Sequence, residues 1–207
     1  DEQCVRDFIR DFGERALRGE LGADDESFYW DVYGAQGVDE AGLRDVIAVM
    51  LTSPQFLYHV EHGQDEVVGQ GPDGELHRLS AYELANRLAY HFWQAPPDDA
   101  LLAAARDGSL LTEAGYKAQV DRVVADARTE SMLSSLFSEW LWLDELRRLD
   151  ALVGTPLFDQ FAGQDSPSET LRQSMIDELV GMASYYTLAN PSSFSELLGS
   201  NKVFTQD

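Results

Sequence analysis

Two histidines with a glutamate between them are the residues of this chain that most resemble a metal site. His59 and His62 lie three positions apart in the stretch LTSPQFLYHVEHG, and Glu61 stands between them. On a helix this spacing would place both rings on one face, as metal ligation requires. The sequence, however, has no H-E-x-x-H motif and no Glu-x-x-His pair to supply further ligands. We therefore assign no metal site, and His59 and His62 stay as the only candidate ligands.

Other catalytic signatures are missing from the sequence. Cys4 is the only cysteine, and there is no Gly-x-Ser-x-Gly elbow to present a serine nucleophile. The stretch GQGPDG (Gly69 to Gly74) has the letters of a dinucleotide-binding loop. Pro72 lies inside it, and neither a strand before it nor a helix after it is predicted, so we interpret it as a turn. Paired carboxylates stay possible in an acidic chain, but the catalytic residues are unknown.

The charge of the chain restricts its partners. Thirty-seven acidic residues against fifteen basic ones leave a net charge of −22 among 207 residues. Such a surface repels nucleic acids and anionic lipids, so we predict no nucleic-acid partner. It attracts cations or a basic protein, although acidity also serves solubility in salty surroundings. No run of about 20 apolar residues predicts a membrane span, and no Cys-x-x-Cys-His motif predicts a haem in this chain.

Helical periodicity dominates the elements that must position these residues. Each of three serines is followed three positions later by a glutamate, which predicts a capping box: Ser80 with Glu83, Ser166 with Glu169, and Ser193 with Glu196. Other helices are predicted at residues 2–18, around 28–33, from Asp39 to about 52, at 98–107, 112–127 and 129–145, and from Pro167 to about Leu188. The stretch FSEWLWLDEL, with Trp140 and Trp142, is apolar almost all round and is expected in the core.

These patterns predict an all-α fold of about nine helices, arranged like a helical bundle. A glycine-rich linker at residues 63–77 is expected after the third helix, because this stretch is rich in turn formers. We expect an N-terminal three-helix part at 1–62 and a larger helical part at 78–207 that is truncated at its C-terminal end.

Two segments resemble the signatures of a known family of unknown function. LTSPQFLYHVE is similar to its L-x-S-P-x-F-L-Y-x-x-E signature, and LSAYELANRLAYHFWQAPPDD to a companion helix followed by a Pro-Pro-Asp corner. The family is of a planctomycete type, found in large exported proteins with cytochrome-c-like domains. The resembling positions are Ser53, Pro54, Phe56, Leu57, Tyr58, Glu61, Tyr82, Glu83, Leu84, Ala85, Arg87, Leu88, Trp93, Pro96, Pro97 and Asp98.

The resemblance implies an exported protein, periplasmic or at the cell surface, with haem in flanking domains and no established reaction. His59 stands where the family pattern has arginine, so the resemblance does not make His59 a metal ligand. His91 and Phe92 also depart from the pattern, which more often has Phe-Leu there.

The two signatures together predict a link between the two parts of the chain. Glu61 and Arg87 are the expected ion pair, and removing one partner of a buried pair would cost about 3–5 kcal/mol. Ser53 and Pro54 are expected to close the third helix. The next three residues, Phe56, Leu57 and Tyr58, are expected to pin the chain to the core.

Three functions stay open from the sequence. The first is a scaffold or docking module for a basic protein or a c-type cytochrome domain. The second is an enzyme domain, either a carboxylate-based polysaccharide hydrolase or a redox subunit whose cofactor is bound elsewhere. The third is a metal-binding helical domain that uses the region of His59 and His62.

Overall fold

The chain forms two compact units in the computed structural model, which describes all residues except 35–36, 149, 164–165, 203 and 205–207. Unit 1 spans Asp1–Ala125 and unit 2 spans Asp126–Asp207. The described residues form eleven α-helices, one π-helix, three short 3-10 helices and a two-stranded sheet. The fold is therefore mostly helical, as predicted, but it has more than nine helices and is not purely α.

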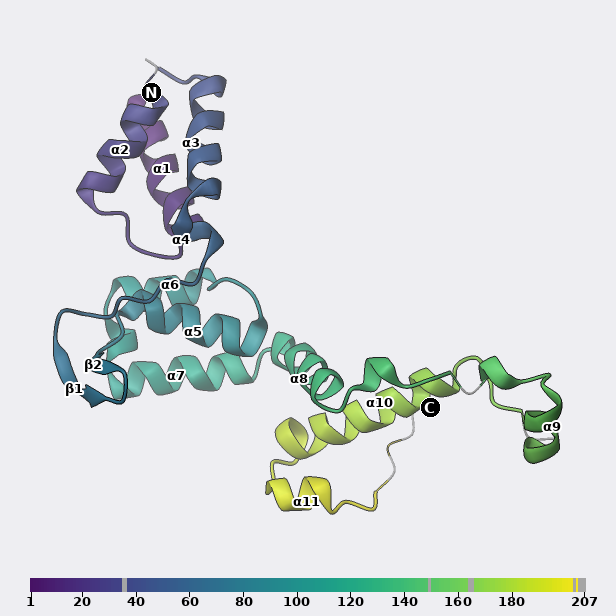
Figure 1. The fold of residues 1–207 in the computed structure, drawn as a ribbon. Coiled ribbons are helices and arrows are strands. Elements are labelled where there is room, and N and C mark those ends of the chain that lie inside the picture. Colours follow the sequence, from purple (N-terminus) through teal and green to yellow (C-terminus); the bar gives the residue numbers. More distant parts are fainter. Residues whose placement is uncertain (35–36, 149, 164–165, 203, 205–207) are drawn as a thin grey trace. The chain divides into compact units, whose positions relative to one another are not determined.

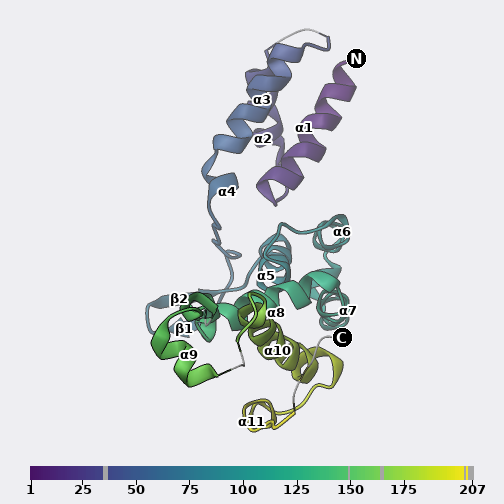
Figure 2. The ribbon, with the colours of Figure 1, turned by 90° about the vertical axis from the view of Figure 1, so that its right-hand side faces the viewer.

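Unit 1 starts with three helices that run side by side: α1 (Glu2–Leu17), α2 (Ala23–Tyr33) and α3 (Glu40–Thr52) (Figure 1, Figure 2). The predicted periodicity places their apolar faces inward. Their shared core consists of Val5, Ile9, Tyr29, Tyr33, Val46 and Met50. Helix α3 begins at the predicted cap, because the Asp39 carboxylate accepts a hydrogen bond of 2.8 Å from Gly42 N. Gly42 also permits close packing, since a Cβ there would lie 2.7 Å from Tyr33 O.

Pro54 begins a helix as well as ending one. Ser53 closes α3 by donating from Oγ to Met50 O at 2.8 Å, and the same Oγ accepts from Phe56 N at 3.3 Å. Pro54 then occupies the first position of the short helix α4 (Pro54–Leu57), where its missing N–H costs nothing. The expectation that Ser53 and Pro54 only close the third helix was therefore incomplete.

The predicted linker contains a β-hairpin. Strand β1 (Val67–Gly71) pairs antiparallel with β2 (Gly74–His77), and the register shifts between Val67 and Gly69. Pro72 and Asp73 form the connecting turn, and Gly74 has a φ of 139° that favours glycine. GQGPDG is thus a hairpin turn, as its turn interpretation expected. The all-α prediction missed this hairpin, because the Pro-Asp-Gly turn lets the flanking residues of the predicted linker pair.

The second half of unit 1 contains α5 (Ala81–Trp93), α6 (Asp99–Arg106), the 3-10 helix η1 (Ser109–Leu111) and α7 (Glu113–Val124). Ser80 and Glu83 form the predicted capping box at the start of α5. Asp98 caps α6 by accepting from Leu101 N at 2.9 Å. The core of this half consists of Ala81, Ala85, Leu88, Ala89, Trp93, Leu101, Ala104, Ala105, Leu110 and Val123.

Unit 2 pairs α8 (Ala127–Trp140) with α10 (Leu171–Ser184). The connecting stretch contains the 3-10 helices η2 (Leu143–Glu145) and η3 (Asp150–Leu152) and the helix α9 (Pro156–Ala162) (Figure 1). After α10 follow the π-helix η4 (Tyr185–Ala189) and α11 (Phe194–Leu198). A small core consists of Leu133, Phe137, Ala183 and Leu197.

Unit 2 corrects several sequence predictions. The expected helix at 129–145 ends at Trp140, and Trp140 and Trp142 are exposed rather than central to the core. The helix expected from Pro167 begins at Leu171, with Thr170 as its first flanking residue. The Ser166–Glu169 box therefore does not form, although the Ser193–Glu196 box does.

No helix among the described residues has both the length and the apolar character that a membrane crossing needs.

Candidate functional site

Arg18 holds the site together, and no sequence motif pointed to it. It follows the last residue of α1 in the left-handed region, with φ 56°, and only 8% of the residue is exposed. Its guanidinium donates to three backbone carbonyls at the end of α4: Gln55 O at 2.5 Å, Phe56 O at 3.1 Å and Tyr58 O at 3.1 Å. Helix ends leave such carbonyls without partners, so Arg18 supplies the cap that α4 lacks.

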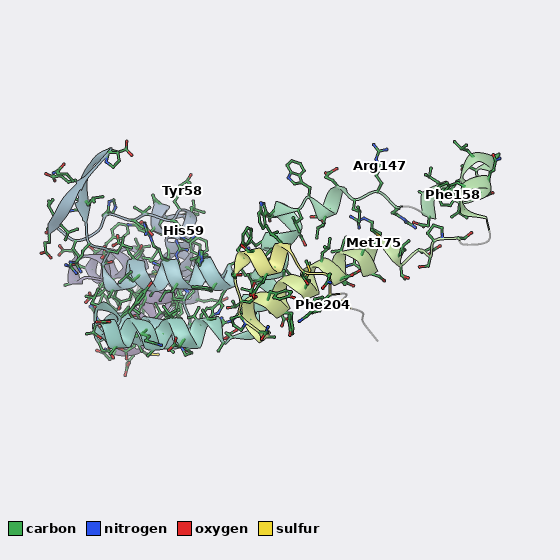
Figure 3. All side chains as sticks on the ribbon, turned by 90° about the horizontal axis from the view of Figure 1, so that it is seen from below. Tyr58, His59, Arg147, Phe158, Met175 and Phe204 are labelled. Atoms are coloured by element: carbon green, nitrogen blue, oxygen red, sulfur yellow. The ribbon has the colours of Figure 1, made fainter. Side chains whose placement is uncertain are left out.

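Hydrogen bonds from Arg18 to backbone carbonyls hold the first signature (residues 51–61), where we expected side-chain packing. Leu57 and Tyr58 are both exposed, and Phe56 is only half-buried. The prediction that these three side chains pin the chain to the core was therefore wrong for Leu57 and Tyr58. Arg18 holds this segment by its carbonyls, which leaves the Tyr58 side chain free to face solvent next to His59 (Figure 3).

Glu61 and Arg87 form the predicted ion pair. Arg87 donates from Nε to Glu61 Oε1 at 2.7 Å and from Nη2 to Glu61 Oε2 at 2.5 Å. The hydrogen bond from Arg87 lowers the pKa of Glu61 and outweighs the opposing effect of burial. The Arg87 side chain is 60% exposed and that of Glu61 is 32% exposed. Solvent screening therefore limits the pair to about 1 kcal/mol, below the 3–5 kcal/mol of a buried pair.

The Glu83 carboxylate joins the start of α5 to the chain that leaves the first signature. It accepts from Ser80 N at 2.7 Å, His62 N at 2.7 Å and Gly63 N at 3.0 Å. Burial alone would raise the pKa of Glu83, but these backbone hydrogen bonds together lower it. Glu83 is thus ionised and fully engaged, which suits positioning better than proton transfer.

The structure does not bring the histidines into a metal site. The His59 ring meets Tyr90 edge-on, with 4.0 Å between ring centroids, and His62 contributes only its backbone N–H to Glu83. His77 Nδ1 lies 2.9 Å from Gln64 O, and His91 meets the ring of Phe92 edge-on. Within the part of the chain that the structure describes, no three His, Cys, Asp or Glu side chains are grouped to hold a metal ion.

A second polar link joins α1 to α5 and α6. The Tyr82 hydroxyl donates a hydrogen bond of 2.7 Å to Glu14 Oε1, and Arg106 makes bidentate hydrogen bonds to the same carboxylate. Burial, together with Glu14, raises the pKa of Tyr82 to about 12. Tyr82 is therefore a hydrogen-bond donor and not an acid at neutral pH. Sequence reasoning found Tyr82 but missed Glu14 and Arg106, which lie 68 and 24 positions from it.

The Pro-Pro-Asp corner has a structural role. Trp93 is buried and donates from Nε1 to Val123 O at 3.1 Å. Pro96 and Pro97 lie in the turn before α6. Asp98 caps that helix and also receives two hydrogen bonds from Arg122, at 2.7 and 2.9 Å. Trp93 and Asp98 therefore tie α7 to the corner.

A cleft of about 320 Å³ lies beside the links made by Arg18, Glu61, Tyr82 and Glu83, but not beside the Pro-Pro-Asp corner. It is lined by Leu17, Arg18, Gly19, Glu20, Gln55, Tyr58, His59, Val60, Glu61, Ser80, Tyr82, Glu83 and Asn86. Asn86 Nδ2 donates to Arg18 O at 3.0 Å, whereas its Oδ1 is buried with no hydrogen-bond partner among the described residues. Both signatures contribute side chains to this cleft, so it is the candidate site of unit 1.

Comparison with known families identifies two matched ranges in the chain, and each range contains one of the two signatures. The chain belongs to the family described as PSD4, protein of unknown function (DUF1592), whose model matches residues 79–207. A second model, PSD5, protein of unknown function (DUF1595), matches residues 4–61. The cleft is therefore built from both matched ranges. Neither the curated proteins nor the solved structures contain a match to the chain.

The resemblance to a family of unknown function is thus confirmed, while the planctomycete type and the cytochrome link stay predictions. The gap between the two family models contains the hairpin and coincides with the predicted linker. The compact units, in contrast, divide between Ala125 and Asp126. The predicted boundary at residues 63–77 therefore also stays a prediction.

Proposed function

We propose that the chain is a non-catalytic docking module of an exported, haem-associated multidomain protein. It would present exposed aromatic side chains in acidic surroundings to a basic partner, such as a c-type cytochrome domain. The exported and haem-associated context rests on the resemblance of the two signatures. The docking role rests on one observation in unit 2: Trp142 is exposed to solvent and has a left-handed backbone conformation.

Unit 2 exposes several large apolar side chains. Trp140 and Phe194 stack with 5.8 Å between ring centroids, yet they are 51% and 56% exposed. Leu157 and Phe161, one turn apart on α9, are 80% and 88% exposed. Single exposed apolar residues are ordinary, but several large ones in one small unit are typical of interaction surfaces.

Trp142 is exposed on a backbone conformation that is unfavourable for a bulky residue. It is 75% exposed and has φ 56° and ψ 37°, the left-handed region that bulky residues rarely adopt. Arg172 maintains the turn that follows, donating to Asp144 O at 2.9 Å and to Leu146 O at 2.7 Å. A left-handed residue costs roughly 1–2 kcal/mol, so an exposed tryptophan here is more easily explained by recognition than by stability.

The charge favours a basic partner. The net charge of −22 would steer a cationic protein toward the chain. Acidic residues also flank the aromatic ones, with Glu139 before Trp140 and Asp144 and Glu145 after Trp142. The other candidate functions gain no separate support, because the carboxylates of Glu61 and Glu83 are already held by an arginine and by backbone N–H groups.

Replacing Trp142 with glycine separates docking from stability. Trp142→Gly removes the indole and suits the left-handed backbone, so we expect unfolding free energy to be unchanged or higher by up to about 1 kcal/mol. Binding to a basic c-type cytochrome, measured by calorimetry, should weaken about tenfold and should also weaken as salt rises. Gln94→Gly is the matched control, since Gln94 is left-handed too, with φ 52°, but belongs to unit 1.

The control variant should bind the cytochrome as the unaltered chain does. Absence of saturable cytochrome binding, or equal binding by both variants, would refute this docking role for Trp142.

A further inference from the structure

The stretch between α8 and α10 exposes apolar side chains that the described residues of unit 2 do not cover. We call residues 150–163 the α9 segment, because this helix forms its second half. Its large apolar residues Leu152, Val153, Leu157 and Phe161 are 51%, 43%, 80% and 88% exposed. No residue of α9 is buried, and Figure 1 shows the helix at one end of unit 2, beyond the pair of α8 and α10.

Local hydrogen bonds hold the shape of the α9 segment. Gly154 N donates to Asp159 Oδ1 at 3.0 Å, and Asp159 N donates to Thr155 O at 2.9 Å. A helix of seven residues is marginal in water by itself, because most helical stability in proteins comes from the packing of an apolar face. The apolar face of α9 therefore needs a covering surface that unit 2 does not supply.

This apolar face carries no charge. Leu157 and Phe161 lie on the same side of α9, because they are four residues apart. Asp159, the only charged residue of the helix, lies about half a turn away from both. A chain with a net charge of −22 repels a second copy over most of its surface, but this face brings no like charges together. It also offers no carboxylate to a basic partner, so a second copy is the partner that it fits.

We propose that α9 packs against α9 of a second copy of this chain, related by a two-fold axis, so that Leu157 of each copy contacts Phe161 of the other. Such a contact is self-complementary and buries the same apolar pair twice. One aromatic side chain buries about 150–250 Å². Covering the four exposed residues of the α9 segment on both copies would therefore bury on the order of 1,000 Å², the lower limit for a specific interface.

Salt separates this contact from the docking role of unit 2, on which the proposal does not rest. An apolar contact between two acidic chains should strengthen as salt screens their repulsion. Binding of a basic cytochrome should weaken under the same change. An interface near the lower size limit also predicts a dimer that dissociates on dilution.

Analytical ultracentrifugation of the full chain, over a range of protein and salt concentrations, tests the dimer. We expect a monomer–dimer equilibrium whose dissociation constant falls as salt rises. Leu157→Ser and Phe161→Ser should each raise that constant about tenfold and leave the melting temperature unchanged, because both side chains are exposed. Phe28→Ser is the matched control, since Phe28 is 54% exposed on α2 of unit 1, and it should leave the dimer unchanged.

Disulfide cross-linking tests which residues meet. In a Cys4→Ser background, which removes the exposed native thiol, we would mix Leu157→Cys chains with Phe161→Cys chains under mild oxidation. This mixture should form cross-linked dimers faster than a mixture of Leu157→Cys and Phe28→Cys chains, because only the first pair of cysteines would approach within disulfide distance.

A chain that stays monomeric under all conditions would overturn the proposal. A dimer that Leu157→Ser and Phe161→Ser weaken no more than Phe28→Ser does would also overturn it, because the contact would then lie elsewhere. Equal cross-linking of the two mixtures would overturn the two-fold pairing of α9. None of these outcomes bears on cytochrome binding through Trp142.

Discussion

At the scale of single residues, Arg18 shows how one side chain can connect distant parts of unit 1. Its guanidinium caps α4, its carbonyl accepts from Asn86 of α5, and its backbone ends α1. Arginine suits this task because its planar fork donates several hydrogen bonds in fixed directions. The residue therefore joins three helices without forming an ion pair that the structure describes.

Arg18→Ala should destabilise unit 1 strongly. The carbonyls of Gln55, Phe56 and Tyr58 would lose a charged donor in a partly buried place, which should lower the unfolding free energy by about 2–3 kcal/mol. Chemical denaturation followed by circular dichroism would measure it. Arg15→Ala, in the last turn of α1, is the control, because the Arg15–Asp99 pair is exposed and should contribute less than about 1 kcal/mol. Equal effects of the two variants would contradict the capping role.

At the scale of elements, the start of α5 is the point that organises the candidate site. Its capping box is local, but the same Glu83 carboxylate also accepts from His62 and Gly63, about 20 positions earlier. The first residues of α5 thereby fix the position of the chain that follows α4, at His62 and Gly63. Glu61 and Arg87 add a solvent-exposed link beside it.

The lowered pKa of Glu83 makes this element sensitive to acid. A carboxyl whose pKa is lower in the folded state stabilises fully above its unfolded pKa of about 4.3. That contribution disappears as the pH falls through the lower folded value. Glu83→Gln should therefore lower stability at pH 7 by about 1–2 kcal/mol and show a smaller loss between pH 7 and about pH 3.

Thermal unfolding across this pH range would measure the difference. Glu113→Gln, in the first turn of α7, is the control and should keep the acid sensitivity of the unaltered chain. An unchanged pH profile in Glu83→Gln would show that the three backbone hydrogen bonds do not stabilise the folded state.

At the scale of the whole molecule, each unit has a hydrophobic core of its own. Among the described residues, unit 1 contains two buried clusters, and unit 2 contains one smaller cluster of four buried residues. Burial of apolar side chains supplies most of the driving force for folding, so stability should be concentrated in unit 1. The exposed aromatic side chains of unit 2 further reduce the apolar area that this unit buries.

Unit 1 should fold when produced as residues 1–125. It contains both signatures, Arg18 with its partners, and all residues that line the cleft. We expect cooperative thermal unfolding and dispersed amide NMR signals from this fragment. A fragment that lacks both would show that unit 1 needs the rest of the chain to fold.

The sequence by itself determined the local features of the protein. Capping residues such as Asp39, Ser80 and Asp98 start helices where predicted, because a cap is satisfied within one turn. The Ser166–Glu169 pair forms no capping box, because the two residue types are compatible with a box but do not make the backbone become helical at Pro167. The Glu61–Arg87 pair was predictable only through the resemblance of the two signatures, and its exposure was not.

Only the tertiary structure decided which groups meet. The Arg18 bonds, the Glu14–Tyr82–Arg106 link and the orphan oxygen of Asn86 depend on residues far apart in the chain. Periodicity shows which face of a helix is apolar, but not which neighbour that face meets. For this reason the apolar stretch around Trp140 predicted a core helix, whereas the packing of α8 on α10 leaves Trp140 and Trp142 exposed to solvent.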